Sequence, residues 1–217
     1  IKLNSDKNFP KKFNAKLLGF SENKIKIFIE NENDLNGEYN LDPLMIKEVI
    51  LNGENDNINN NTALDTFDLY EDYTAITNAD ITEGEEYTIS ITLDGYSDGQ
   101  GSGNSKNNSG AKVYIDYNMN GDFNDPGEEI GIVPYRTSST VGIPELINFT
   151  VPSTGIYGTT RMRVVCQYIN PAPANVNDLN FIGPCDAPTG TWDQPWFGAT
   201  HDYTVTILEG ITCNPSS

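Results

Sequence analysis

The chain has little positive charge. Of its 217 residues only 13 are lysine or arginine, whereas 31 are aspartate or glutamate, so the formal net charge is −18. A surface of that sign repels the phosphates of DNA and RNA, and we expect no nucleic-acid partner. The excess lies in residues 48–217, which carry five basic and 24 acidic side chains, against eight and seven in residues 1–47. Bound cations such as calcium would offset it, and solubility in a salty exterior is the alternative explanation.

Histidine and long apolar runs are also scarce. The single histidine, His201, cannot build a His-rich zinc site and would have to serve any Ser-His-Asp triad. Residues 95–99 match the G-x-S-x-G pattern around Ser97, but a Gly/Ser/Asn-rich segment follows where a nucleophile elbow requires a helix. We therefore interpret the chain as non-enzymatic, with a carboxylate-based hydrolase as a weaker alternative. No apolar run approaches the roughly 18 residues of a membrane span, so no direct membrane insertion is expected.

Cysteine is rare too, with three residues in the whole chain. Cys166 lies in an apolar, strand-like segment and Cys185 in a loop, so a disulfide between them is expected in an oxidising compartment. Cys213 would then pair with a group outside this chain. Three unpaired thiols are the alternative.

Nothing in the composition favours long helices, because Gly, Asn, Asp, Thr and Ser replace the residues that helices prefer. β-Branched and aromatic residues alternate at residues 24–29, 87–93, 112–115 and 202–207, with further strand candidates at 45–51, 146–151 and 161–168. Turn-forming clusters separate them, among them the Asn-rich residues 55–61. The pattern predicts an all-β fold: an antiparallel β-sandwich, jelly-roll or Ig-like, with long loops at 97–110 and 170–200.

Three regions are expected along the chain. Residues 1–43 are Lys-rich and form a strand-rich N-terminal extension or the end of a preceding domain. Residues 44–209 form the sandwich, and residues 210–217 a C-terminal linker. Because the chain begins at Ile1 without a signal peptide, we expect it to be a processed or excised piece of a longer protein.

The sharpest motif directly follows the strand candidate at 112–115. Oxygen-bearing side chains occupy alternate positions, at Asp116, Asn118, Asn120 and Asp122. This spacing turns several hard oxygens toward one centre, as calcium requires. It resembles the first half of an EF-hand loop, but Gly127 stands at the twelfth position, so Asp125 or Glu128 would complete the shell. We predict a calcium site, with a self-capping Asx-rich turn as the alternative; magnesium fits less well because it keeps more of its waters.

Both tryptophans fall within one predicted loop. Loop aromatics flanked by polar groups form platforms for sugar rings, so Trp192 and Trp196 would stack on a glycan while Asp193 and Gln194 hydrogen-bond to it. Alternatively, the tryptophans cap the end of the sandwich as a satellite core. A surface glycan is the leading partner class, and a protein partner the second.

Two arginines alternate with apolar residues in the strand candidate at 161–168. Arg161 and Arg163 therefore point to one face of the strand. In so acidic a chain they are expected to pair with carboxylates such as Asp72 or Asp202 in bidentate geometry. A clamp for an anionic sugar is the functional alternative.

Several segments resemble the GEVED domain in order along the chain. Residues 113–123 are similar to its central V-W-I-D-W-N-x-D-G-D-F sequence, residues 45–49 to its opening strand, 69–74 to its Y-x-D-Y-T, 158–164 to its G-T-T-R-M-R-V and 198–205 to its G-E-V-E-D-Y. The resemblance covers about residues 45–208. In the last motif Ala199 and His201 replace the two glutamates, so that only Asp202 is kept of the three acids. Any role of those glutamates in holding a cation or in packing is therefore weakened.

The resemblance implies a β-sandwich module from secreted, multidomain proteins of Bacteroidetes-type bacteria, exported through type IX secretion with a sorting domain elsewhere in the parent protein. It supplies no activity, because such domains accompany proteases, glycosidases and adhesins alike. Taken with the residues above, it leads us to expect a secreted, calcium-stabilised accessory module at the cell surface. That module would mediate binding or adhesion beside other domains of the parent chain. A structural spacer or stalk is the alternative.

Overall fold

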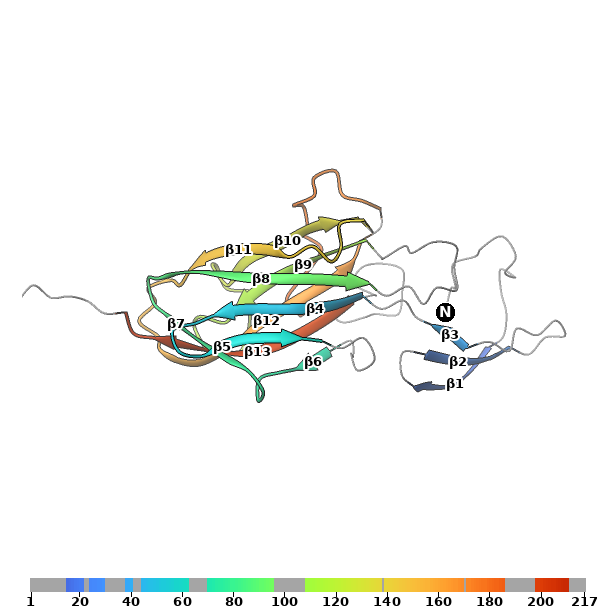
Figure 1. Ribbon diagram of the computed structural model, residues 1–217, viewed down its shortest axis with the longest axis horizontal. Coiled ribbons are helices and arrows are strands. Elements are labelled where there is room, and N and C mark those ends of the chain that lie inside the picture. The colour runs from blue at the N-terminus through green and yellow to red at the C-terminus, as the bar shows by residue number, and fades with distance from the viewer. Residues whose placement is uncertain are drawn as a thin grey trace, which may run out of the picture.

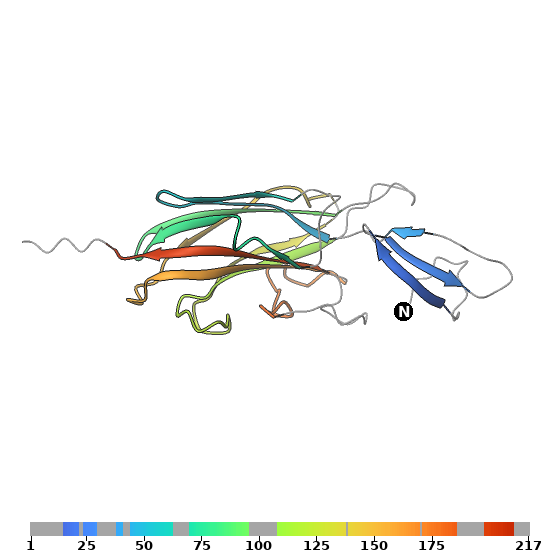
Figure 2. The same ribbon diagram turned by 90° about the horizontal axis from the view of Figure 1, so that it is seen from below.

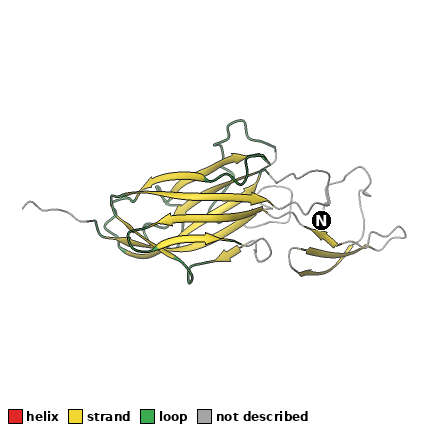
Figure 3. Cartoon of the chain, viewed as in Figure 1, coloured by secondary structure: helices red, strands yellow, loops and turns green. Residues whose placement is uncertain are grey.

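A computed structural model describes residues 15–21, 24–29, 38–40, 44–62, 70–95, 108–137, 139–169, 171–185 and 198–210. The described residues form thirteen strands and no helix, which confirms the predicted all-β class (Figure 3). They accordingly offer no helix that could cross a membrane.

Three strands at the start of the chain make a small antiparallel sheet of their own, in the order β1 (Ala15–Ser21), β2 (Lys24–Ile29), β3 (Glu38–Asn40). The other ten strands are β4 (Leu44–Asn52), β5 (Asn57–Asn61), β6 (Tyr70–Asp72), β7 (Asn78–Thr82), β8 (Glu86–Gly95), β9 (Ser109–Ile115), β10 (Glu129–Arg136), β11 (Glu145–Thr150), β12 (Gly158–Tyr168) and β13 (Gly198–Leu208).

These ten strands form the two layers of a sandwich. One sheet has the order β10-β9-β12-β13-β6, with β7 also paired to β13, and the other has the order β11-β8-β4-β5. Figures 1 and 2 show the two sheets lying face to face, with β4 over β12 and β13. The predicted β-sandwich is confirmed. The predicted domain boundaries after residues 43 and 209 stay predictions.

The core lies between the sheets and follows the two-residue period of the strands. Along β13 the side chains of Tyr203, Val205 and Ile207 are buried in one cluster with residues of the facing sheet, such as Ile46 and Ile89. The intervening side chains of β13 point to the opposite, outer face of the sheet. Strands β9 and β12 alternate in the same way, so their outer faces are available to build a site.

A second apolar cluster covers part of that outer face. Tyr114 of β9 and Val165 of β12 pack there against Ile169, Leu179 and Ile182, and the Tyr114 hydroxyl donates to the Ile182 carbonyl at 3.2 Å. Residues 171–185 thus lie on the outer face of the six-stranded sheet, as a loop of the predicted kind.

One edge of the sandwich departs from the predicted antiparallel pattern. Strand β6 pairs in parallel with β13 at Thr200↔Tyr70, and β7 does so further along at Thr204↔Asn78. The parallel pairing arises because the chain passes from β5 in one sheet to β6 in the other, instead of returning through a hairpin.

The prediction of a turn over the Asn-rich residues 55–61 is wrong for residues 57–61. Residues 57–61 form β5, which pairs with β4 along its whole length. Ile58 explains the difference, because its side chain is fully buried while Asn57, Asn59 and Asn61 face solvent from an edge strand. One buried residue and a ladder of backbone hydrogen bonds outweigh the low strand propensity of asparagine.

The predicted disulfide between Cys166 and Cys185 is also wrong, since both are free thiols. Cys166 shares the core cluster with Val164, so its side chain points between the sheets. Cys185 lies in the loop on the outer face, next to Pro184, whose carbonyl accepts a hydrogen bond from Arg163 Nη1 at 3.0 Å. The two thiols are therefore on opposite faces of β12, and burial raises the pKa of Cys166 to about 12. Cys213 lies outside the described residues.

Asp80 of β7 holds the turn between β4 and β5. Its carboxylate is buried and accepts hydrogen bonds from the backbone N–H of Asn55 and of Asp56, both at 2.8 Å, and from Asn55 Nδ2 at 2.7 Å. Burial alone would raise the pKa of Asp80, but these donors outweigh it and lower the pKa from 3.8 to about 2.

We expect Asp80→Asn to lower the free energy of unfolding at pH 7 by about 2 kcal/mol, because it weakens hydrogen bonds to a charged acceptor. The pKa is lower in the folded than in the unfolded chain, so this stabilisation is present above the unfolded pKa and disappears as the pH falls toward 2. Urea unfolding at pH 7 and at acidic pH measures both effects. The exposed Asp56→Asn is the control, and a wild-type advantage that stays constant down to the folded pKa would contradict the assignment.

Candidate functional site

All six residues predicted as metal ligands lie in one loop, residues 116–128, which connects β9 to β10. The loop is tied to the neighbouring strand β12: Asp116 N donates to the Arg161 carbonyl at 3.1 Å, and Thr160 Oγ1 donates to the Asp116 carbonyl at 2.6 Å. Its two ends are joined as well, because Ile115 N donates to the Glu128 carbonyl at 2.9 Å. The loop is therefore anchored on the sheet at both ends.

Asp116 organises the first turn of the loop. Its side chain is buried, and its two oxygens accept hydrogen bonds from the backbone N–H of Asn120 at 3.1 Å and of Gly121 at 2.9 Å. The turn requires left-handed backbone at Met119, with φ of 58°, and at Gly121, with φ of 89°. Glycine accommodates this conformation without a steric penalty, which accounts for Gly121 between the last two oxygen-bearing residues.

The alternate oxygen-bearing residues continue this curl through local turns. The side-chain oxygen of each accepts a hydrogen bond from the backbone N–H two residues on: Asn118 from Asn120 at 3.0 Å, Asn120 from Asp122 at 2.8 Å, and Asp122 from Asn124 at 2.7 Å. The spacing that predicted a calcium loop thus also produces consecutive Asx turns, as the alternative interpretation expected.

Three carboxylates converge inside the curl. One oxygen from each of Asp122, Asp125 and Glu128 lies within 4.8 Å of the others. Asp125 Oδ2 also accepts hydrogen bonds from the side-chain amides of Asn118 and Asn120, both at 2.7 Å. Asp125 and Glu128, considered at first as alternatives for closing the shell, therefore enter the same cluster together.

Glu128 is the unusual member of this cluster. It is only 2% exposed, and its Oε1 has no hydrogen-bond partner in the part of the chain that the structure describes. Burial is the largest influence on the pKa of Glu128 and raises it; backbone donors oppose the rise, and the nearby Asp116 and Asp125 reinforce it. A buried carboxylate oxygen without a donor is costly, and so is a buried charge beside other carboxylates; a cation would relieve both costs.

The donor set restricts which cation would fit. The cluster offers only carboxylate oxygens, which suit calcium or magnesium; zinc and copper prefer sulfur or imidazole ligands. Asn118 and Asn120 turn their amide nitrogens toward Asp125, so their oxygens do not join the cluster in this arrangement. The lone histidine lies elsewhere, on β13.

Beside this loop, Arg163 and Asp202 form the predicted bidentate pair. Arg163 Nε donates to Asp202 Oδ1 and Nη2 donates to Oδ2, both at 2.7 Å, and Asp202 is fully buried. The Tyr70 hydroxyl also donates to Oδ2, at 2.9 Å. The Arg163 guanidinium lies 4.9 Å from the centre of the Phe123 ring, so the pair contacts the 116–128 loop directly.

Arg161 lies on the same face but is held much less tightly. Its side chain is 51% exposed, and its Nη1 lies 3.6 Å from Asp202 Oδ2, an oxygen already shared by Arg163 and Tyr70. The prediction that the arginines pair with carboxylates such as Asp72 or Asp202 in bidentate geometry is therefore confirmed for Arg163, whose partner is Asp202, and not for Arg161.

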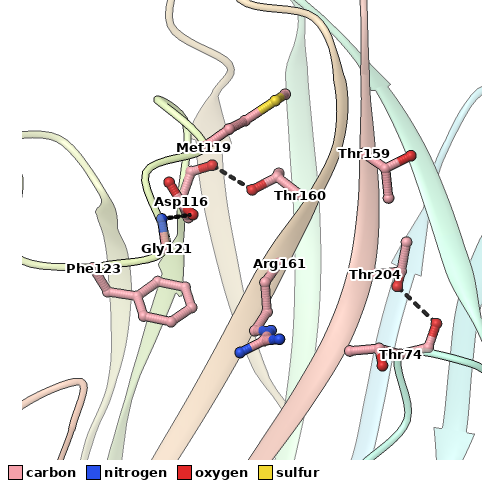
Figure 4. Close-up of a pocket in the computed structure, with 9 residues that line it drawn as sticks. All are labelled: Thr74, Asp116, Met119, Gly121, Phe123, Thr159, Thr160, Arg161 and Thr204. Atoms are coloured by element: carbon pink, nitrogen blue, oxygen red, sulfur yellow. Dashed lines mark hydrogen bonds between the residues drawn. The ribbon is translucent and has the colours of Figure 1, made fainter.

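Arg161 faces a hollow of about 330 Å³ on the outer face of the sheet (Figure 4). The hollow is lined by the 116–128 loop on one side and by β12, β13 and the end of β6 on the other: Thr74, Asp116, Met119, Gly121, Phe123, Thr159, Thr160, Arg161 and Thr204. Figure 4 shows Arg161 between the loop and the threonines of the neighbouring strands.

The sequence alone did not indicate that this hollow is a candidate site. The alternation of Thr159, Arg161 and Arg163 places all three on one face of β12, and that much is visible in the sequence. Thr74 and Thr204 join them only through the pairing of β13 with β12 on one side and with β6 on the other, which no sequence pattern indicated.

The His201 side chain is fully buried. Its Nδ1 lies 3.0 Å from the Tyr203 hydroxyl and its Nε2 lies 3.0 Å from Glu71 Oε2. Ala199 also faces the core, so both replacements in the G-E-V-E-D-Y motif are interior positions, while the retained Asp202 faces outward to Arg163. Ser97, the candidate nucleophile of the weaker triad interpretation, lies outside the described residues.

The predicted sugar platform of Trp192, Asp193, Gln194 and Trp196 also lies outside the described residues.

Comparison with known proteins identifies one domain. Residues 110–206 match the family model described as the GEVED domain, which covers strands β9 to β13 and therefore the 116–128 loop, the Arg163–Asp202 pair and most of the hollow. No curated protein and no solved structure matches the chain.

Proposed function

We propose that this chain, which carries a GEVED domain at residues 110–206, is a calcium-stabilised, non-catalytic binding module of an exported surface protein. One observation carries the calcium part: the buried Glu128 carboxylate, whose Oε1 has no hydrogen-bond partner among the described residues, lies in a cluster with Asp122 and Asp125. Without a cation this arrangement places the buried Glu128 carboxylate beside two other negative charges. With one, each carboxylate gains a partner of opposite charge.

Calcium suits this cluster better than magnesium does. It takes about six to eight oxygen ligands in flexible geometry, so carboxylates and amides from a tightly curled loop can share it with water. Magnesium demands near-ideal octahedral geometry and keeps several of its waters. The acidity of residues 48–217 adds a general attraction for divalent cations.

In this proposal the cation fixes the wall of the hollow. Asp116, Met119, Gly121 and Phe123 belong both to the loop that would hold calcium and to the lining of the hollow. A bound cation would hold these side chains in one arrangement and so prepare the hollow for a ligand. Surface glycans are the proposed ligand class, because threonine hydroxyls and a guanidinium offer the donors and acceptors that sugar hydroxyls require.

The test is thermal unfolding in excess EDTA and again after calcium is restored. We expect calcium, at about 100 times its Kd, to raise the midpoint by roughly 5–10 °C, since binding to the folded state alone adds about 2.7 kcal/mol. The variant Asp122→Asn with Asp125→Asn should lose this increase. The control, Glu85→Gln with Glu86→Gln, removes the same charge from exposed positions outside the loop and should keep it.

Equal midpoints in EDTA and in calcium would show that residues 116–128 are only a self-capping turn. An increase that survives in the loop variant would assign the cation to another site.

A structural spacer is the second candidate, and the path of the chain favours it. Strand β4 begins at one end of the sandwich and β13 ends at the other (Figure 1). Domains attached before Leu44 and after Leu208 would thus be held apart along the long axis. Calcium-dependent stability together with no affinity on a glycan array would favour the spacer over the binding module.

A further inference from the structure

We propose that the hollow beside the 116–128 loop binds a carboxylate-bearing sugar, a uronic acid unit, with Arg161 as its anchor. This deepens the proposed binding function and rests on it for the ligand class. The site itself rests on the geometry around Arg161.

Arg161 has no carboxylate within close ion-pair distance among the described residues. Three of the four other cations in the described sandwich have a close carboxylate: Lys112 lies 2.8 Å from Glu129, Arg163 lies 2.7 Å from Asp202, and Arg136 contacts Glu145. The fourth, Lys47, has a longer contact of 3.5 Å with Asp94 on the facing sheet. Arg161 has a 3.6 Å approach to Asp202, whose two oxygens already accept three hydrogen bonds, and an electrostatic attraction to the exposed Asp72. Its guanidinium is therefore available for a second carboxylate.

The Arg161 side chain is also placed where a ligand could reach it. The side chain of Arg161 is 51% exposed, yet it lies within a hollow instead of extending over a flat surface. A guanidinium presents paired N–H groups that match the two oxygens of a carboxylate, which a single sugar hydroxyl cannot do. The geometry thus favours a carboxylate over a neutral hydroxyl at this point.

The other residues that line the hollow fit a sugar ring. The hydroxyls of Thr160 and Thr204 donate to the carbonyls of Asp116 and Thr74 at 2.6 Å and 2.7 Å, so their lone pairs are oriented and free to accept from ligand hydroxyls. Met119 adds an apolar surface for the ring carbons. A volume of about 330 Å³ lies at the small end of ligand sites and suits one sugar unit.

The negative charges near Arg161 set the conditions for binding. Asp202 is neutralised by Arg163, and both oxygens of Asp116 accept backbone hydrogen bonds within the loop. Asp72 is exposed, with Thr74 donating to it from backbone and side chain. Repulsion from the rest of the chain is screened beyond about 8 Å at physiological salt, and calcium in the loop would reduce it further.

The experiment titrates D-galacturonate, and D-galactose as its neutral match, into the whole chain with calcium present, followed by amide chemical shifts. We expect galacturonate to bind in the millimolar range and galactose about tenfold more weakly. Arg161→Gln should lower the affinity for galacturonate about tenfold and abolish the preference, and Arg161→Lys should fall between. Lys47→Gln on the facing sheet removes one positive charge outside the hollow and should leave binding unchanged.

Three outcomes would overturn the proposal: no galacturonate binding by the wild type, equal affinity in Arg161→Gln, or shifts confined to residues outside the hollow. The loop variant Asp122→Asn with Asp125→Asn separates the two proposals. Binding that needs these acids but survives in Arg161→Gln would place the carboxylate on calcium and leave the calcium site intact. Binding that needs Arg161 in a chain that shows no calcium effect would retain the sugar site and remove the calcium proposal.

Discussion

Asp202→Asn is expected to lower the free energy of unfolding by about 3 kcal/mol, with the fold retained at low temperature. The substitution keeps the shape of the side chain but leaves the Arg163 guanidinium, only 15% exposed, without its counter-charge. Breaking a buried pair from one side costs about 3–5 kcal/mol, and the partial exposure of Arg163 places this case at the low end. Asp202 also accepts from Tyr70 of β6, so β6, β12 and β13 all lose a contact.

Urea unfolding measures this loss of stability, and two further variants serve as comparisons. Arg163→Lys keeps the charge but cannot make both parallel hydrogen bonds and reach the Pro184 carbonyl, so we expect a loss of about 1.5–3 kcal/mol. Lys47→Gln, which removes a partly exposed ion pair at 3.5 Å, should cost less than about 1 kcal/mol. If Asp202→Asn were as mild as Lys47→Gln, the pair would not be the structural centre of this face.

Glu128→Gln is expected to act in opposite directions with and without calcium. In EDTA the amide removes a buried like charge and can donate to Asp122 or Asp125, so the chain should become more stable by on the order of 1 kcal/mol. In calcium the same change removes one charged ligand and should weaken calcium binding about 10- to 100-fold, because ligand charge strongly sets the affinity of such sites.

Calorimetric titration with calcium and urea unfolding in EDTA measure the two effects separately. Glu86→Gln, an exposed substitution of the same kind outside the loop, should change neither. A Glu128→Gln variant that is destabilised in EDTA would show that this carboxylate has an ordinary structural role. Such a result would contradict the calcium proposal, which depends on the Glu128 carboxylate being unfavourable without a cation.

Local patterns in the sequence predicted much of the fold correctly. The alternation at 87–93, 112–115 and 202–207 predicted strands β8, β9 and β13, because side chains along a strand return to the same face every two residues. The same period placed Arg161 and Arg163 on one face. The oxygen-bearing positions after β9 fold into one loop, as their spacing indicated.

Long-range pairing could not be predicted in this way. The parallel register of β6 and β7 on β13 depends on a crossing between sheets, and strand periodicity says nothing of such crossings. The same gap explains the wrong disulfide, since the side of β12 that the 171–185 loop covers is decided by the apolar contacts of Leu179 and Ile182. Glu128 is a third case: its sequence neighbours are polar, and only the folded loop shows that it is buried.

The path of the chain through the sandwich also determines how it would respond to mechanical force. A pull applied between Leu44 and Leu208 loads β13 along its own axis, toward the end where it leaves the sheet (Figure 1). Strand β13 is flanked by β12 on one side and by β6 and β7 on the other, so its ladders lie across the direction of load. Because the bonds of these ladders would have to shear together, we expect the sandwich to resist extension along this axis more strongly than if they could open one at a time.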